Sequence, residues 1–334
     1  MMKRLKVALL GLQGVGTELL RAAQADDQFE LVAIAEADSE TLRREAEGLS
    51  VPLFADHRSA IVESVQLGLD AVLITLPPYQ AVEFDVLAAE RGIGVFQTVP
   101  WARNVLEARR VVEVFARCGV PLVLARPWQS EPATAGLRDP ASLVGRVFAA
   151  EVSVRASPGP LGWRGDSVRA GAGVLLNDAY EQLDLLVCLF GLPQTVFGQA
   201  RQAISPGAPR KYDTEDAMAL TLVFSGDRVG SLMAWRGAGA PEWSITLVGQ
   251  DGVIHLCRER MAVHRPDLLV PQVHSIRTSY RMAPALAAFG AAHQAGLRKR
   301  ESMAAEHLST IAVLEAAYLS AKTGAPESPR PFLP

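Results

Sequence analysis

Short apolar runs alternate with amphipathic stretches over the first 125 residues of the chain. The runs are rich in Val, Ile and Leu, and the stretches between them repeat apolar residues at helical spacing. Nearly continuous apolar strands separated by helices indicate a parallel sheet that is covered on both faces. The predicted strands are residues 5–10, 30–35, 52–55, 71–75, 94–97 and 121–125. The predicted helices are residues 15–25, 39–47, 57–67, 81–91 and 105–118, with Ser39 and Asp56 as N-caps of the second and third.

The pattern changes after residue 125 to strands joined by turn residues. The predicted strands are residues 147–155, 217–224, 229–236, 244–249 and 252–256, and the predicted helices are residues 175–189 and 302–323. Ser225-Gly226-Asp227 and Gln250-Asp251-Gly252 are hairpin signals, which indicate a mostly antiparallel open sheet. The strand at 217–224 is apolar on both faces. One face is expected to pack on helices that include 175–189, and the other needs a cover, for which we expect a second subunit.

Composition and charge narrow the class of protein further. A length of 334 residues suits two domains, and 33 basic against 36 acidic residues give a net charge of −3. That balance argues against a nucleic-acid partner, which would select a basic face. No apolar run is long enough to cross a membrane, and the run near the N-terminus is too short for a signal peptide. The three cysteines lie far apart without metal-ligand spacing, so we expect a cytoplasmic protein without a bound metal.

The first strand-to-helix turn reads Gly-Leu-Gln-Gly-Val-Gly over residues 11–16. Dinucleotide-binding folds place three glycines here, spaced G-x-G-x-x-G, for the tight turn, the approach of the pyrophosphate and the packing of helix on strand. Gly11 and Gly16 fill the first and third positions, whereas Gln13 occupies the second. We expect the cofactor phosphates to lie against Gly11, Gln13, Gly14, Val15 and Gly16 at the helix N-terminus. The alternative is a glycine-rich turn that binds no ligand.

Glu36 ends the second predicted strand, about 20 residues after the glycine turn, where a ribose-binding carboxylate is expected. A carboxylate at this point accepts hydrogen bonds from both ribose hydroxyls and repels a 2′-phosphate, and Asp38 adds to that repulsion. The sequence therefore favours NAD over NADP. The alternative is an ordinary acidic residue at a strand end.

Further motifs resemble those of the Gfo/Idh/MocA oxidoreductases, a family named for glucose–fructose oxidoreductase and inositol dehydrogenase. The matching segments are residues 70–77 (DAVLITLP), 94–100 (GVFQTVP), 163–164 (WR), 171–175 (GAGVL), 249–252 (GQDG) and 315–318 (EAAY). The resemblance implies an α/β chain with an N-terminal Rossmann domain, a doubly wound parallel sheet, over residues 1–125. It implies a C-terminal α+β domain with a large, mostly antiparallel open sheet over residues 126–334, which often forms homo-oligomers.

The same resemblance implies an activity. Most members of the family move a hydride between NAD(P) and a carbon of a sugar or polyol, so we expect a small-molecule substrate of that kind. Within the matching segments, the resemblance implies cofactor contacts at Thr75, Pro77 and Thr98.

Two motifs depart from the family pattern. The family usually reads Glu-Lys-Pro where this chain has Thr98-Val99-Pro100, and its lysine approaches the reacting hydroxyl. The family's second motif, Gly-Gly-x-x-x-Asp-x-Gly-x-His, has Asn177 in place of the aspartate and Glu181 in place of the histidine. The usual catalytic lysine and histidine are thus replaced.

Oxidation of an alcohol by a nicotinamide needs a base that takes the hydroxyl proton. Glu181 is the best remaining candidate, and Asn177, four residues earlier on the predicted helix, shares its face. Arg164 follows Trp163 in the preceding loop and is expected to orient a polar substrate. The alternative is that Asn177, Glu181 and Asp184 form a polar stripe on a solvated helix, with Arg164 the partner of a carboxylate.

Three functions compete on this basis. The first is an NAD-dependent oxidoreductase with an altered proton-transfer group. The second is a catalytically reduced relative that binds a nucleotide or sugar-like ligand as a regulator or scaffold. The third is a lyase or hydrolase that uses bound NAD internally. The residues favour these functions in that order. Fold alone does not determine function, so all three stay open at this point.

Overall fold

The computed structural model describes residues 4–157, 159–202, 212–237, 239–276, 282–294 and 304–333. The chain forms two compact units. Unit 1 contains Met1–Ala102, Leu106–Ser130 and Ser279–Ala305, and unit 2 contains Arg103–Val105, Glu131–Thr278 and Glu306–Pro334. The chain thus enters each unit in three segments, whereas the sequence analysis predicted a single division at residue 125.

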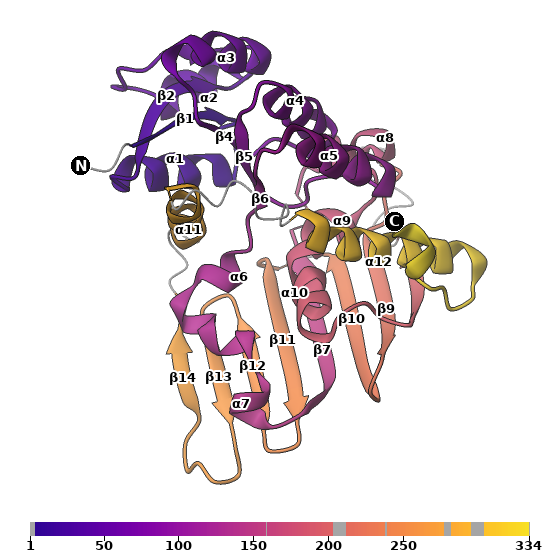
Figure 1. Ribbon diagram of the computed structural model, residues 1–334. Coiled ribbons are helices and arrows are strands. Elements are labelled where there is room, and N and C mark those ends of the chain that lie inside the picture. Colours follow the sequence, from indigo (N-terminus) through magenta and orange to yellow (C-terminus); the bar gives the residue numbers. More distant parts are fainter. Residues whose placement is uncertain are drawn as a thin grey trace. The chain divides into compact units, whose positions relative to one another are not determined.

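Unit 1 is built on a six-stranded sheet in the order β3-β2-β1-β4-β5-β6, with every pair parallel (Figure 1). This order is that of a doubly wound dinucleotide-binding fold, which confirms the predicted fold class. The strands are β1 (Leu5–Leu10), β2 (Phe29–Ala35), β3 (Leu53–Phe54), β4 (Ala71–Ile74), β5 (Gly94–Gln97) and β6 (Leu122–Leu124). The helices are α1 (Val15–Ala25), α2 (Ser39–Glu45), α3 (His57–Ser64), α4 (Pro78–Glu90), α5 (Val105–Cys118), α6 (Pro127–Ser130) and α11 (Ala283–Gln294).

Helix α11 joins this unit from far along the sequence and was not predicted. Its Phe289 packs 5.6 Å from the ring of Phe96 in β5, and the backbone N–H of Met282 donates to Glu18 of α1 at 2.7 Å. The segment APALAAFGAAHQ contains Pro284 and Gly290 and lacks a polar face, so its sequence carries no amphipathic signal.

The beginnings of α2 and α3 show how local chemistry sets a helix boundary. Asp38 caps α2, because its carboxylate accepts from the backbone N–H groups of Glu40 and Thr41 at 2.9 and 3.0 Å. The predicted cap at Ser39 is therefore wrong by one residue, since Ser39 is already helical. Asp56 caps α3 through the N–H of Ser59, as predicted.

A carboxyl is fully buried in unit 1. Asp85 of α4 has no exposed surface, and burial raises its pKa well above the usual value. With its amide nitrogen toward Asp85, Gln97 at the end of β5 donates to both carboxylate oxygens at 3.0 and 2.8 Å. This pair ties α4 to the strand that leads into Thr98.

The Asp85→Asn variant is expected to lose a pH dependence of stability. Because its pKa is raised on folding, Asp85 favours the native state most below its unfolded pKa of about 4, and this contribution is lost as pH rises through the folded pKa. Between those values the free energy of unfolding of the wild type should fall, relative to the variant, by up to about 1.4 kcal/mol per pH unit. Urea unfolding at several pH values measures this difference. The exposed Glu90→Gln on the same helix is the control, and parallel curves for wild type and Asp85→Asn would show that Asp85 does not titrate in this way.

Unit 2 is built on an eight-stranded sheet in the order β14-β13-β12-β11-β7-β10-β9-β8. All pairs are antiparallel except β10 with β7, which confirms the predicted mostly antiparallel sheet. The strands are β7 (Val147–Ala156), β8 (Thr195–Arg201), β9 (Ala217–Phe224), β10 (Arg228–Arg236), β11 (Glu242–Gly249), β12 (Val253–Cys257), β13 (Arg260–His264) and β14 (Gln272–Ser275). The α-helices are α7 (Ala141–Val144), α8 (Ser167–Ala170), α9 (Val174–Asp178), α10 (Tyr180–Phe190) and α12 (Ala304–Thr323), and 3₁₀ turns include Gly162–Gly165.

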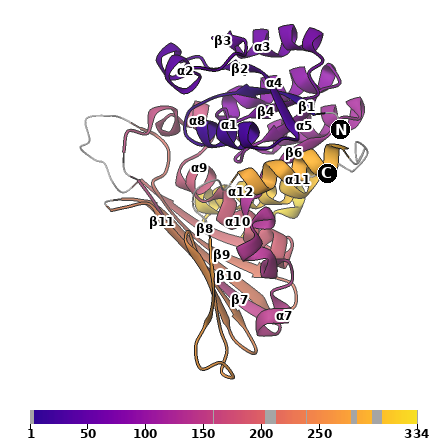
Figure 2. The same ribbon diagram turned by 90° about the vertical axis from the view of Figure 1, so that its left-hand side faces the viewer.

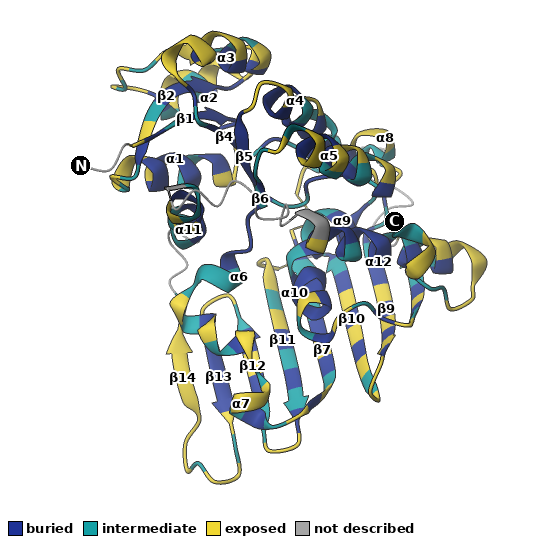
Figure 3. Cartoon of the chain, in the orientation of Figure 1, coloured by how far each residue is buried: buried dark blue, intermediate teal, exposed yellow. Residues whose placement is uncertain are grey.

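The two faces of this sheet differ. Buried and exposed residues alternate along β9 and β10 (Figure 3), and the buried ones include Leu220, Leu222 and Leu232. Helices α10 and α12 cover the buried face (Figure 2), which confirms that one face of residues 217–224 packs on the chain's own helices. Among the described residues, no helix covers the other face, where Val223, Val229 and Met233 are exposed.

Two features are absent from the described ranges. No helix there is long and apolar enough to cross a membrane. Within the same ranges, no group of three or more His, Cys, Asp and Glu side chains is arranged to hold a metal ion.

Candidate functional site

The glycine turn of unit 1 is built by close approach of backbone to backbone. A Cβ on Gly16 would lie 2.5 Å from the carbonyl oxygen of Gly11, and a Cβ on Gly11 would lie 2.8 Å from Oγ1 of Thr75. Gly11 and Gly14 also have positive φ, 93° and 58°. Glycine is thus required on packing grounds at the first and third positions of the motif.

The N-terminus of α1 is open to a ligand. Gly14 is its N-cap and makes no side-chain cap, so in the described part of the chain no side chain closes this helix end. Gln13, Gly14 and Val15 are exposed, and Gln13 contributes its carbonyl to the N–H of Gly16 at 3.0 Å. Exposed N–H groups at the positive end of a helix dipole suit the phosphates of a dinucleotide.

Thr75, Pro77 and Thr98 lie beyond the carboxyl ends of β4 and β5, the edge at which doubly wound sheets bind ligands. The hydroxyl of Thr75 donates to the carbonyl of Gly11 at 2.9 Å and so supports the turn itself. The N–H of Thr98 donates to the carbonyl of Ile74 at 3.1 Å, and its side chain is buried. Pro77 is the N-cap of α4. The neighbouring Val99 is half-buried.

Glu36 connects the end of β2 to the glycine turn. One carboxylate oxygen accepts from the N–H of Leu12 at 2.8 Å, and the other accepts from the N–H of Asp38 at 3.0 Å. The side chain is only 5% exposed, so its position is determined by these bonds. Each oxygen retains capacity for a second hydrogen bond, which is what the two ribose hydroxyls of NAD require. The residues of this unit therefore fit the cofactor.

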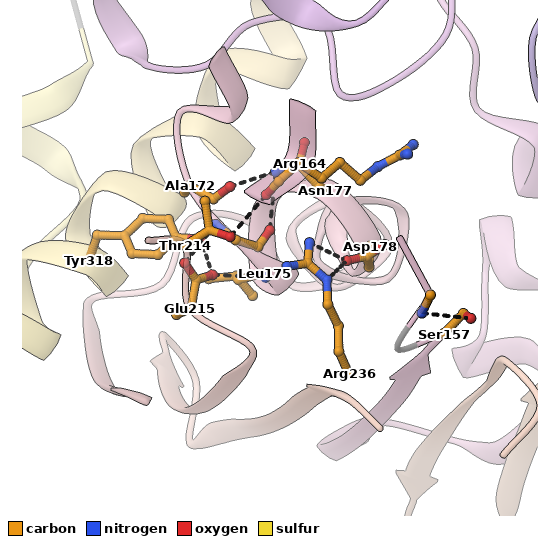
Figure 4. Close-up of polar contacts among 12 residues, drawn as sticks. Ser157, Arg164, Ala172, Leu175, Asn177, Asp178, Thr214, Glu215, Arg236 and Tyr318 are labelled. Carbon is orange, nitrogen blue, oxygen red and sulfur yellow. Dashed lines mark hydrogen bonds and ion pairs between the residues drawn. The ribbon is translucent and has the colours of Figure 1, made fainter. Parts of the chain in front are cut away.

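In unit 2 a second polar cluster surrounds the beginning of α9 (Figure 4). The carboxylate of Glu215 accepts from the N–H groups of Gly173 and Leu175 at 2.6 and 3.2 Å and from the hydroxyl of Tyr318 at 2.8 Å. Burial raises the pKa of Glu215, and these donors oppose the rise. A Cβ on Gly173 would lie 1.9 Å from the Glu215 carbonyl oxygen, so this approach needs glycine. Glu215 thus caps α9 and determines its position.

Asn177 is oriented by that cap. Its amide nitrogen donates to the carbonyls of Ala172 and Gly173 at 2.7 and 3.2 Å. Its Oδ1 is buried and has no hydrogen-bond partner among the described residues. A buried acceptor without a donor costs free energy of about 1–3 kcal/mol, which a bound hydroxyl group would recover.

Glu181 lies in the first turn of α10 and is half-buried. The predicted helix over residues 175–189 is interrupted at Ala179, where φ is −114° and ψ is 6°, so it consists of α9 and α10. The expectation that Asn177 and Glu181 share the face of one continuous helix is therefore corrected.

Asp184 does not lie on a solvated stripe. It is 2% exposed, accepts from the hydroxyl of Thr310 in α12 at 2.7 Å and lies 3.2 Å from Nδ1 of His307. Asp184 therefore holds α10 against α12.

Arg236 pairs with Asp178, and Arg164 lies in the same region of unit 2 without a bond to either (Figure 4). The guanidinium of Arg164 lies 4.6 Å from the ring centre of Trp163. Desolvation lowers the pKa of Arg164, Asp178 raises it and Arg236 lowers it. The direct partner of Asp178 is Arg236, whose Nε and Nη2 lie 2.9 and 2.8 Å from Oδ2. Asp178, Arg236 and Glu215 were not predicted. Arg236 and Glu215 come from a strand and a loop distant in sequence, whereas Asp178 adjoins Asn177 but occupies a variable position of the motif.

The tyrosines of this cluster are excluded as bases near neutral pH. Burial and a hydrogen bond to Asp216 raise the pKa of Tyr212 to about 12, and its hydroxyl donates to Asp216 at 2.8 Å. Burial beside Glu215 raises the pKa of Tyr318 well above its usual value. Both hydroxyls therefore stay protonated, which leaves the carboxylates as proton acceptors.

Known proteins share this fold. The chain is 24% identical over 352 residues to D-apiose dehydrogenase of Paraburkholderia graminis, with 96% of this chain and 89% of that protein covered. Levoglucosan dehydrogenase, solved with NADH and levoglucosan, superposes with a TM-score of 0.84 at 20% identity over 98% of this chain and 99% of that one. An oxidoreductase from Agrobacterium radiobacter, solved with NAD+, L-tartaric acid and magnesium, superposes with a TM-score of 0.83 at 17% identity over 99% of this chain and 100% of that one.

Family models match both parts of the chain. Residues 5–125 match the model described as "Oxidoreductase family, NAD-binding Rossmann fold", and residues 141–255 match the GFO/IDH/MocA C-terminal domain. Together the two matches cover more than half of the sequence, in the order that the family requires. The cofactor of such an N-terminal domain is NAD. The chain therefore belongs to the Gfo/Idh/MocA family of oxidoreductases.

Proposed function

We propose that this protein is an NAD-dependent oxidoreductase that acts on a hydroxyl group of a sugar, polyol or related compound, with an atypical proton-transfer group. The observation that carries the proposal is Glu36, a buried carboxylate bound to the glycine turn of an NAD-binding family domain. Sugar dehydrogenases among its relatives support the substrate class.

The residues that would hold NAD belong to unit 1. The turn at Gly11, Gln13, Gly14, Val15 and Gly16 would face the phosphates, and Glu36 would accept from the ribose hydroxyls. Thr75, Pro77 and Thr98 would line the carboxyl edge of the sheet beside them. Glu36 and the exposed Asp38 disfavour the 2′-phosphate of NADP by charge repulsion. Bound NAD supplies the hydride acceptor.

Glu181 is proposed as the general base that removes the proton of the substrate hydroxyl. Val99 occupies the position of the family's lysine and has no group that donates, accepts or carries charge. With both tyrosines of the cluster protonated, a carboxylate is the remaining acceptor in this part of the motif. Asn177 is proposed to accept a hydrogen bond from a substrate hydroxyl through Oδ1, and Arg164 to orient the substrate.

Absorbance at 340 nm tests the proposed function. NAD is mixed with the protein and a panel of sugars, polyols and sugar acids, and NADH formation is expected with at least one compound. If NAD binds and no compound is oxidised, the protein is a catalytically reduced relative. If a compound is converted without net NADH, it uses NAD internally as a lyase or hydrolase.

We also propose that the exposed face of the eight-stranded sheet forms a homo-oligomer. This face presents Phe197, Val223, Val229 and Met233 without a covering helix among the described residues. The Met233→Glu variant is expected to shift the protein toward monomer, because a charge in an apolar interface loses its hydration. Sedimentation velocity measures the shift. Leu67→Glu is the matched control, since Leu67 of unit 1 and Met233 are both 45% exposed, and an equal effect of the two variants would exclude this face.

A further inference from the structure

Arg236 is a buried cation with unused hydrogen-bonding capacity. Its side chain is 2% exposed and reaches from the end of β10 to Asp178, the last residue of α9 (Figure 4). Nε donates to Oδ2 of Asp178 and Nη2 lies 2.8 Å from the same oxygen, yet neither Nη1 nor Nη2 has a hydrogen-bond partner among the described residues. A guanidinium has five N–H donors, and leaving two of its nitrogens unsatisfied in a buried site is costly. An acceptor is missing from this site.

The other carboxylates near Arg236 have donors of their own. Asp216 accepts from the hydroxyl of Tyr212 at 2.8 Å. Glu215 accepts from two backbone N–H groups of the α9 cap and from Tyr318. The ion pair of the Arg236 guanidinium is with Asp178, at 2.8 and 2.9 Å.

Arg164 supplies a second guanidinium within electrostatic range of the same carboxylate. It makes no ion pair with any described residue, and its guanidinium is stacked on Trp163 at 4.6 Å. Both Asp178 and Arg236 act on it electrostatically, which places the three charges in one cluster. Arg164 is exposed and Asp178 is 22% exposed, so the cluster reaches solvent at these two residues while Arg236 is buried below them. Two cations thus share one directly paired carboxylate.

We propose that Arg236 and Arg164 form a binding subsite for a carboxylate group of the substrate, so that the preferred substrates are sugar acids rather than neutral sugars or polyols. The inference rests on the proposed function for the identity of the ligand as a substrate. The carboxylate accepts from Nη1 of Arg236 and from the guanidinium of Arg164, and Trp163 holds Arg164 in place. Asn177, next to Asp178 in α9, offers its unpartnered Oδ1 to a hydroxyl of the same molecule.

The surrounding charges favour a carboxylate over a phosphate. Asp178, Asp216 and Glu215 all lie in the cluster around Arg236, so a dianion would be repelled more strongly than a singly charged group. A planar carboxylate also matches the geometry of guanidinium donors. A neutral hydroxyl would satisfy one donor and leave the second cation without an anion.

Isothermal titration of the protein saturated with NADH tests the subsite, with gluconate against sorbitol and glucuronate against glucose as probes. Each acid is expected to bind more tightly than its neutral counterpart. Arg164→Gln should reduce that preference roughly 10- to 100-fold, the usual effect of losing a charge-assisted hydrogen bond. Arg236→Lys should reduce it as well, and its melting curve shows whether the variant still folds.

The control is Arg169→Gln in α8, an exposed arginine that pairs with Asp166. Equal binding of acids and neutral counterparts, or an acid preference unchanged in Arg164→Gln, would overturn the subsite. The outcome is separable from that of the proposed function. NADH formation from neutral sugars at the same kcat/KM as from acids would retain the dehydrogenase and remove the subsite, whereas tight acid binding without oxidation would retain the subsite and remove the dehydrogenase.

Discussion

Glu181→Gln is expected to lower kcat by about a hundredfold or more, because the amide cannot take the hydroxyl proton that must leave with the hydride. The side chain keeps its size and its hydrogen-bonding reach, so NAD affinity and the melting temperature should stay close to those of the wild type. Steady-state NADH formation and an NAD titration measure the two effects separately.

A matched control separates this role from a general effect of charge. Glu259→Gln removes an exposed carboxylate in the turn between β12 and β13 and should leave kcat unchanged. Equal turnover of Glu181→Gln and wild type would eliminate Glu181 as the base. The proton acceptor would then have to be another group, with Asp178 and Asp184 the nearest carboxylates in sequence.

Glu36→Gln is expected to weaken NAD binding by roughly 10- to 100-fold, since hydrogen bonds to a charged acceptor contribute about 1.5–3 kcal/mol. NADP affinity should change less, because the variant also loses the repulsion of the 2′-phosphate. The preference for NAD over NADP therefore shrinks. Calorimetric titration with both nucleotides measures it.

The glutamine is nearly isosteric, and its carbonyl oxygen retains the bond from the N–H of Leu12 or of Asp38, which limits damage to the turn. Glu40→Gln in the first turn of α2 is the control, because that side chain is exposed and makes no bond to the turn. Unchanged affinity for both nucleotides in Glu36→Gln would remove Glu36 from the binding site.

Much of the parallel sheet was predictable because its strands are buried on both faces. Residues 5–10, 94–97 and 105–118 were predicted with the bounds that the structure shows for β1, β5 and α5. The glycines at 11 and 16 were predictable from the motif, and the structure gives the reason: a side chain at either position would collide with the backbone of Gly11 or with Thr75. The sequence pattern was sufficient where segments close in sequence pack against one another.

The candidate site of unit 2 was harder to predict because its contacts span long stretches of sequence. Glu215 caps α9 from 42 residues away, and Arg236 pairs with Asp178 from 58 residues away. The motifs supplied Gly173, Asn177 and Tyr318, yet nothing in their spacing identifies the carboxylate that binds two of them. The sequence shows only that Arg236 stands at the end of the predicted strand 229–236, and its burial becomes visible in the structure.

The prediction of helix boundaries was wrong where a single residue interrupts a helix. Residues 175–189 have the pattern of one apolar helix, but Ala179 divides them into α9 and α10. Hydrophobic periodicity over a window of residues does not reveal one non-helical residue. Helix α11 was not predicted, because its segment of small apolar residues lacks the alternation of apolar and polar faces that identifies an amphipathic helix.

We expect this chain to bind NAD and to prefer it to NADP despite Gln13 in the glycine turn. Calorimetric titration of the purified protein with NAD and with NADP measures both affinities. NAD should bind saturably and NADP at least tenfold more weakly, a difference of about 1.4 kcal/mol. Absence of binding by either nucleotide, or tighter binding of NADP, would contradict this expectation.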